Sequence, residues 1–175
     1  FVLKNLNAED HFNVVAYSDS VEAFFEELVP ANRDKIDLAL QRLDAVDATG
    51  GTNIHEALQV GLRDIAERKG DARPAYVIFL TDGLPTIGKT DENEILKDSA
   101  AANKGKARLF AFGVGYDVNV RLLDKLVAEN RGKSDYVKPK EPIERKIASL
   151  YSKIKNPVMT ELAVEMSKVR LVDVY

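Results

Sequence analysis

The sequence predicts an α/β fold: an open, doubly wound, mostly parallel sheet with helices on both faces. Short apolar segments rich in β-branched residues alternate along the chain with longer segments of helical periodicity. Hydrophobic residues make up 45% of the chain and charged residues 30%, which is typical of a folded globular domain. Strands that alternate with helices form parallel βαβ units, and such units build a sheet of this kind.

The first half of the chain carries five segments with signals for a helix or strand. In order, these are the end of an apolar helix at 1–6, a buried strand at 11–19, a short edge strand at 21–28, and amphipathic helices at 32–46 and 54–70. The β-branched pair Val14 and Val15 marks the buried strand. Asn32 is the predicted N-cap of the first amphipathic helix, and Gly70 ends the second.

The two amphipathic helices each have a predicted apolar face. The predicted core residues are Ile36, Leu40 and Leu43 in the first helix and Ile54, Leu58, Leu62 and Ile65 in the second. Spacings of three and four residues place each set on one side of its helix.

The second half continues the alternation. Strands are predicted at 75–80, 107–115 and 134–138, and helices at 91–105, 118–130 and 141–154. Pro142 stands in the first turn of the last helix, where its missing amide hydrogen is tolerated.

The pattern changes after Asn156 and Pro157. Residues 158–175 alternate apolar and polar side chains, which predicts two antiparallel strands. We therefore expect two units: a main domain at 1–155 and, at 156–175, a β extension toward a neighbouring β-rich module of the same polypeptide.

Composition excludes several classes of function. The net charge of −3 and the isoelectric point near 5.5 argue against nucleic-acid binding and against anionic membrane surfaces. We expect no membrane insertion by this segment, because no apolar run approaches the ~20 residues that cross a bilayer. The lack of cysteine excludes disulfides, thiolate metal sites and cysteine nucleophiles.

Two residues are candidates for chemistry. Asp82 ends the strand in "YVIFLTDGLPT", and Thr52 follows two glycines in "DATGGTN". Each residue could instead have a purely structural role. The sequence Asp-Gly-x-Pro favours a turn, and a threonine before a helix is often its N-cap. In open α/β sheets, however, ligands bind beyond the carboxyl ends of the strands. A hydroxyl and a carboxylate placed there could supply two of the oxygens that Mg²⁺ requires.

Four segments together resemble a known family. "DHFNVVAYSD", "ATGGTNIHEAL", "YVIFLTDGLPT" and "RLFAFGVG" stand in the order and spacing of von Willebrand factor type A domains. The chain looks most similar to the subfamily of the inter-alpha-trypsin inhibitor heavy chains and their bacterial relatives, over 1–154. The resemblance implies a metal-ion-dependent adhesion site in which Thr52 and Asp82 match the threonine and aspartate ligands.

The chain departs from the family pattern in one respect. The family's Asp-x-Ser-x-Ser loop, which follows its first strand, occurs nowhere among the 175 residues. Ser18, Asp19 and Ser20 form a polar loop after the strand that resembles the family's second, and we interpret them as loop-capping residues. We expect the first strand, which is central in this fold, to lie upstream of Phe1. As given, the chain then carries only part of the metal site.

The resemblance implies a non-enzymatic binding module, extracellular or on the cell surface. A Mg²⁺ ion, or Ca²⁺ or Mn²⁺, would bridge the module to a carboxylate of a protein partner. One alternative is a Mg²⁺-dependent phosphohydrolase with Asp82 as nucleophile, although Gly83 and Leu84 supply no second acid beside it. The other alternative is a metal-free scaffold domain.

Overall fold

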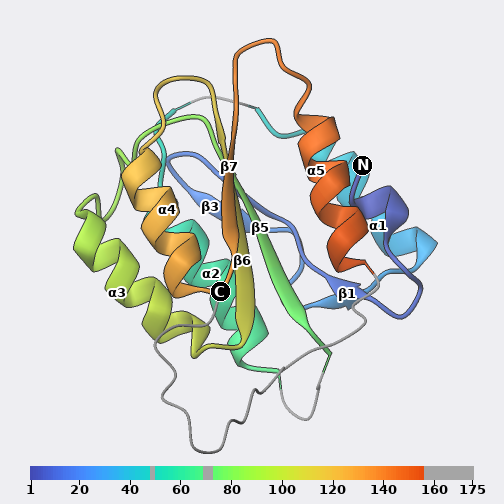
Figure 1. Ribbon diagram of the computed structural model, residues 1–175. Coiled ribbons are helices and arrows are strands. Elements are labelled where there is room, and N and C mark those ends of the chain that lie inside the picture. Colours follow the sequence, from blue (N-terminus) through green and yellow to red (C-terminus); the bar gives the residue numbers. More distant parts are fainter. Residues whose placement is uncertain (48–49, 69–72, 156–175) are drawn as a thin grey trace, which may run out of the picture.

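The computed structural model describes residues 1–47, 50–68 and 73–155. Its strands form three separate sheets, of which the largest is parallel (Figure 1). The extension predicted at 156–175 and its boundary lie outside the described residues and stay predictions.

The parallel sheet has the order β5-β6-β7. Its strands are β5 (Ala75–Thr81), β6 (Ala107–Val114) and β7 (Lys133–Val137). Thr81 pairs with Gly113, and Gly113 pairs with Tyr136, so the carboxyl ends of all three strands lie at one edge. This confirms the prediction of parallel α/β units for the second half of the chain.

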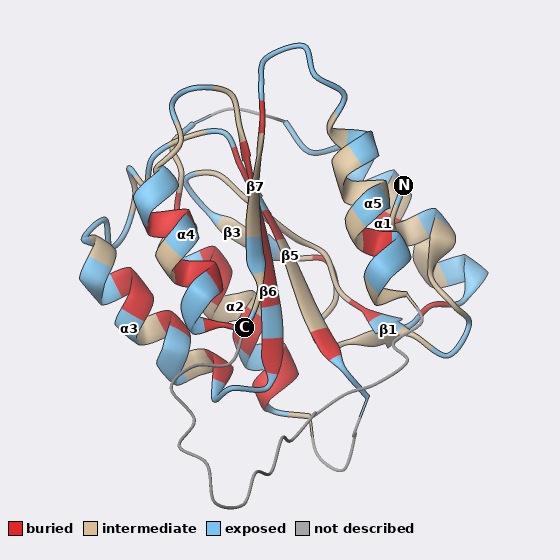
Figure 2. Cartoon of the chain, in the orientation of Figure 1, coloured by how far each residue is buried: buried red, intermediate tan, exposed pale blue. Residues whose placement is uncertain are grey.

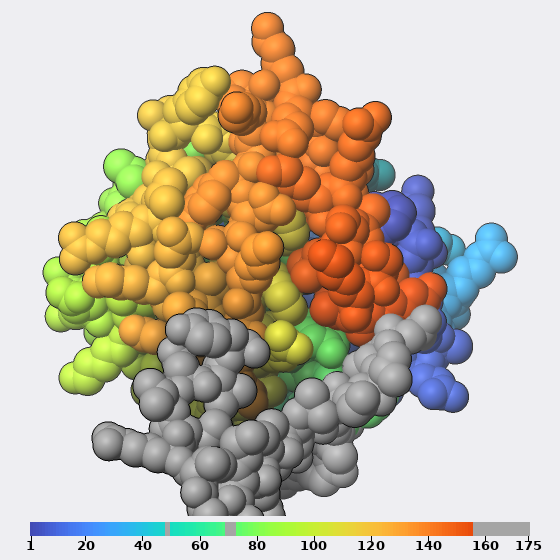
Figure 3. Space-filling view, in the orientation of Figure 1, coloured from blue at the N-terminus to red at the C-terminus, as the bar shows by residue number. Residues whose placement is uncertain are grey.

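Five α-helices accompany the strands in the described residues. They are α1 (Arg33–Asp44), α2 (Ile54–Ala66), α3 (Glu92–Asn103), α4 (Val120–Glu129) and α5 (Ile143–Ile154). In Figure 1, α2, α3 and α4 lie on one side of the parallel sheet, and α5 and α1 lie on the other. The segment between β7 and α5 projects from the carboxyl edge of the sheet (Figure 3). The doubly wound arrangement as one continuous sheet stays a prediction.

The N-terminal third is built from short strands. β1 (His11–Phe12) pairs with β4 (Val29–Pro30), and β2 (Val15–Tyr17) forms a hairpin with β3 (Val21–Ala23). The predicted helix end near the N-terminus is a single 3₁₀ turn, η1 (Leu3–Asn5).

The single strand predicted over 11–19 is wrong, because the chain breaks at Asn13. The Asn13 side-chain oxygen accepts hydrogen bonds from the amides of Val14, at 2.8 Å, and Phe25, at 3.1 Å. A side chain thus takes the place of a ladder carbonyl and separates β1 from β2.

The core lies between the parallel sheet and helices α2, α3 and α4. The predicted face of α2 is confirmed, since Ile54, Leu58, Leu62 and Ile65 are all buried. The predicted face of α1 is wrong in part. Ala39 is the buried residue of that helix, whereas Leu43 is 47% exposed. Leu43 stands in the last turn of α1 and faces solvent.

The two strands nearest the middle of the molecule differ in burial. Six of the eight residues of β6 are buried, but only three of the seven residues of β5 are, and Leu80 is 40% exposed (Figure 2). Within the described residues, β5 pairs with β6 alone and β2 pairs with β3 alone. Tyr17 of β2 joins these two sheets: its hydroxyl donates to the Leu80 carbonyl at 2.5 Å, and its ring stacks on Phe79 at 5.6 Å.

Candidate metal site at the carboxyl edge of the sheet

Three loops meet at the carboxyl edge of the parallel sheet. They are the hairpin turn at 18–20, the segment 50–53 before α2, and the loop 82–88 after β5. The Asn53 amide donates to the Ser18 carbonyl at 2.9 Å, which joins the second loop to the first. The Thr86 amide donates to the Thr52 carbonyl at 3.0 Å, which joins the second loop to the third.

Thr52 is fixed on both sides by Thr86. The Thr52 amide donates to the Thr86 hydroxyl oxygen at 2.8 Å, and the Thr52 carbonyl accepts from the Thr86 amide. The Ile87 amide also approaches this carbonyl, at 3.4 Å. The backbone of Thr52 is therefore held against the loop that begins with Asp82.

The structure brings the two predicted site residues together at this edge. A Cβ atom built on Gly83 would stand 3.3 Å from the Thr52 hydroxyl oxygen, so this hydroxyl packs against the residue that follows Asp82. Thr52 is partly buried and Asp82 is exposed. In the part of the chain that the structure describes, neither the Thr52 hydroxyl nor the Asp82 carboxylate makes a hydrogen bond or ion pair, so these oxygens are free for a ligand.

The paired glycines of "GGT" are required by close contacts. Gly50 has a φ of +96°, and a Cβ atom there would lie 2.7 Å from the Asp19 carboxylate. A Cβ atom on Gly51 would lie 2.5 Å from Ile87 Cγ1. The close backbone approach predicted for these glycines is thus present, and what they approach are the two neighbouring loops.

Asp19 and Thr86 take part in the site's framework in different ways. The Asp19 carboxylate accepts a hydrogen bond from the Gly51 amide, so it bonds to a neighbouring loop and not within its own turn. Thr86 was not singled out from the sequence. Its position at the end of the "TDGLPT" stretch, on the same edge as Asp82, was the available signal.

Tyr17 lies close to Asp82 and carries a perturbed pKa. Burial raises the pKa of the Tyr17 hydroxyl to about 12, and the Asp82 charge acts in the same direction, while a hydrogen bond with Thr81 opposes it. The hydroxyl is therefore neutral at physiological pH and donates to the Leu80 carbonyl.

A charged cluster stands beside the site. His55 Nε2 lies 2.9 Å from Asp98 Oδ2, and Lys89 Nζ lies 2.6 Å from the same oxygen. Lys89 first and His55 second hold the pKa of the Asp98 carboxyl below its usual range. The cluster ties α2 and the end of the Asp82 loop to α3, which agrees with a structural role for His55.

The described residues contain only part of a metal site. Among them, no group of three or more His, Cys, Asp or Glu side chains could hold a metal ion. Thr52 and Asp82 supply one hydroxyl and one carboxylate, which is fewer than the six or more oxygens of a Mg²⁺ or Ca²⁺ shell.

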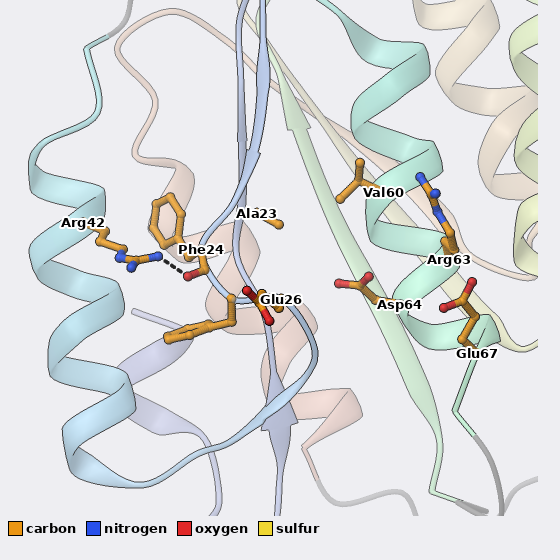
Figure 4. Close-up of a pocket in the computed structure, with 9 residues that line it drawn as sticks. Ala23, Phe24, Glu26, Arg42, Val60, Arg63, Asp64 and Glu67 are labelled. Atoms are coloured by element: carbon orange, nitrogen blue, oxygen red, sulfur yellow. Dashed lines mark hydrogen bonds between the residues drawn. The ribbon is translucent and has the colours of Figure 1, made fainter.

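A cavity of about 620 Å³ lies elsewhere, between β3, α1 and the C-terminal half of α2 (Figure 4). Val60, Arg63, Asp64 and Glu67 line it from α2. Asp64 is eleven residues along the helix from Asn53, or about 16 Å at 1.5 Å per residue, so this cavity is separate from the loop cluster.

No helix in the described part of the chain combines the length and apolarity needed to cross a membrane.

Three comparisons with known proteins bear on this site. The chain is 28% identical over 169 residues to human inter-alpha-trypsin inhibitor heavy chain H4, covering 94% of this chain and 18% of that protein. A von Willebrand factor type A structure from Catenulispora acidiphila superposes with a TM-score of 0.77 at 18% identity, over 88% of this chain and 36% of that one. Proximal thread matrix protein 1 of the mussel byssus, with a zinc-occupied metal-ion-dependent adhesion motif, superposes with a TM-score of 0.56 at 21% identity, over 83% and 37% of the two chains.

The chain thus spans less than a fifth of the curated relative's length, and the two structures support the fold alone. The family profile of the von Willebrand factor type A domain itself matches residues 1–136, which include all three loops of the candidate site. This chain belongs to the von Willebrand factor type A domain family.

Proposed function

We propose that this chain is a metal-ion-dependent protein-binding module of the adhesion type. The observation that carries the proposal is the meeting of Thr52 with the Asp82 loop, residues that are 30 positions apart in the sequence. Both present oxygen atoms that no described residue binds, at the edge of the sheet where ligands of open α/β folds bind.

The donor types favour a hard cation. The Asp82 carboxylate and the Thr52 hydroxyl would hold Mg²⁺, or Ca²⁺ or Mn²⁺, and such ions prefer oxygen ligands. The zinc-occupied motif of the mussel protein supports a cation site on this fold. When bound, the ion supplies an open coordination position that accepts a carboxylate oxygen of a protein partner.

The remaining ligands would come from a strand upstream of Phe1. We place it between β2 and β5, with an Asp-x-Ser-x-Ser loop at its carboxyl end. Two observations support this placement: each of these strands is paired on one side only in the described residues, and Leu80 of β5 is 40% exposed. A strand inserted there would bury Leu80 and take over the carbonyl that Tyr17 now binds.

We infer binding rather than catalysis. A phosphohydrolase needs a second acid beside its nucleophile and a lysine on the phosphate, and the residues that follow Asp82 are Gly83, Leu84 and Pro85. From the family resemblance we also propose an extracellular or cell-surface location.

Isothermal titration calorimetry of the natural full-length chain with MgCl₂ tests the proposal. We expect one binding site, a loss of at least about 100-fold in affinity for Asp82→Ala and a smaller loss for Thr52→Ala, because a charged ligand contributes more than a hydroxyl. Asp117→Ala is the matched control, since Asp117 is an exposed acid on the loop after β6 at the same edge. No divalent binding, or equal binding by the wild type and Asp82→Ala, would contradict the proposal.

A further inference from the structure

Three consecutive amides in the loop before α2 are bound by three different partners. The Gly51 amide donates to Asp19 Oδ1, the Thr52 amide to the Thr86 hydroxyl, and the Asn53 amide to the Ser18 carbonyl. Asp19 is the charged acceptor among them. A hydrogen bond to a carboxylate is roughly twice as strong as one between neutral groups.

The Asp19 carboxylate fits closely against the glycine loop. Its oxygen and carbon atoms lie 2.7–2.9 Å from the Cβ position of Gly50, and Oδ1 lies 2.8 Å from the Cβ position of Gly51. Only glycines leave room for the carboxylate on this side of the loop. The two glycines and the acid are therefore one packed unit, although 30 residues separate Asp19 from Gly50.

The hairpin turn that carries Asp19 is itself fixed. The Ser18 amide donates to the Ser20 carbonyl at 2.9 Å, and the Ser18 carbonyl accepts from the Asn53 amide at 2.9 Å. Asp19 therefore projects from a closed turn that contacts the loop before α2 at two points.

We propose that Asp19 is a positioning residue of the metal site. It fixes the Gly51 amide and so sets the direction in which the next residue, Thr52, presents its hydroxyl beside Asp82. Asp19 acts through the loop, because its Oδ1 accepts the hydrogen bond of the Gly51 amide. This inference rests on the proposed function for its effect on metal affinity, but the anchoring of Gly51 is independent of any metal.

Two variants distinguish the hydrogen bond that Asp19 makes to the Gly51 amide from the negative charge of Asp19. Asp19→Asn keeps an acceptor oxygen for the Gly51 amide and loses the negative charge, whereas Asp19→Ala removes the acceptor. Asp117→Ala removes an exposed acid at the same edge and is the control for long-range electrostatics.

The first measurement is hydrogen–deuterium exchange of the segment 50–53 in the natural full-length chain without metal. Asp19→Ala is expected to raise the exchange rate at Gly51 most. Asp19→Asn raises it less, because it keeps a neutral acceptor, and Asp117→Ala leaves it close to the wild-type rate. This measurement tests the contact between Asp19 and the Gly51 amide even if the chain binds no ion.

The second measurement is Mg²⁺ affinity by calorimetry. Asp19→Ala is expected to weaken binding by about 10-fold or more, the usual effect of losing a group that orients a ligand. Asp19→Asn restores most of that loss, and the melting temperature without metal changes little for either variant. Unchanged exchange at Gly51 in Asp19→Ala overturns the inference. An affinity loss in Asp19→Asn equal to that in Asp19→Ala also overturns it, because Asp19 would then act through its charge.

If the wild type binds no Mg²⁺ but Asp19→Ala still raises the exchange rate at Gly51, the proposed function is wrong. The role of Asp19 in fixing the Gly51 amide is then still supported.

Discussion

Single side chains hold this molecule together over both short and long sequence distances. The Asn32 side chain caps α1 by accepting a hydrogen bond from the Lys35 amide at 2.9 Å. That contact spans three residues, so the local sequence encodes it. Asp19 and Thr86 act across 32 and 34 residues, on Gly51 and Thr52. Their roles depend on which loops the fold brings together, and a single sequence carries no local signal for that.

Asp64 offers a test at the residue scale through pH. Burial raises the pKa of this carboxyl, while the Asn13 amide, at 3.0 Å, opposes the rise. A raised folded-state pKa means that the folded chain binds the proton more tightly than the unfolded chain. The unfavourable contribution of Asp64 is therefore absent below 3.8, the ordinary pKa of an aspartate, and develops as the pH rises above that value.

We accordingly expect Asp64→Asn to raise the melting temperature at pH 7 and to leave it unchanged near pH 3. Thermal unfolding at the two pH values measures this directly. Glu67→Gln is the matched control, an exposed acid that lines the same cavity. A stabilisation by Asp64→Asn that is as large at pH 3 as at pH 7 would contradict this account of Asp64.

At the scale of elements, periodicity predicted the parallel strands and most helices, because each of these has a face or core that its own sequence encodes. It failed at 11–19, where the Asn13 side chain divides one apolar run into β1 and β2. It also failed for Leu43, which is 47% exposed in the last turn of α1. At Asn13, a hydrogen bond from the Phe25 amide, outside the predicted strand, decides the outcome.

Tyr17 is the test at this scale, since in the chain of 175 residues it links β2 to β5. Tyr17→Phe keeps the stacking on Phe79 and removes the hydrogen bond to the Leu80 carbonyl. Losing one such bond is expected to cost about 1 kcal/mol in the free energy of unfolding, which urea denaturation can measure. The control is Tyr116→Phe, whose ring is 80% exposed. An equal effect of the two substitutions would show that the Tyr17 hydroxyl contributes nothing to joining the sheets.

At the scale of the whole molecule, the fold places three loops that are distant in sequence at one edge of the sheet. The family motifs predicted Thr52 and Asp82, and the structure places the Thr52 hydroxyl against Gly83, directly after Asp82. The framework around them, made by Asp19, Gly51 and Thr86, became visible only in three dimensions. The fold topology therefore creates the site. The central feature of the proposed function is one cation that Thr52 and Asp82 share.

Anomalous diffraction from crystals of the natural full-length chain grown with Mn²⁺ tests that claim most directly. We predict an anomalous peak that contacts both the Thr52 hydroxyl and the Asp82 carboxylate, either directly, at about 2.0–2.6 Å, or through one water. The peak should be absent in Asp82→Ala crystals and present in Asp117→Ala crystals. A peak bound elsewhere in the domain, such as at His55 and Asp98, with none between Thr52 and Asp82, would contradict the account.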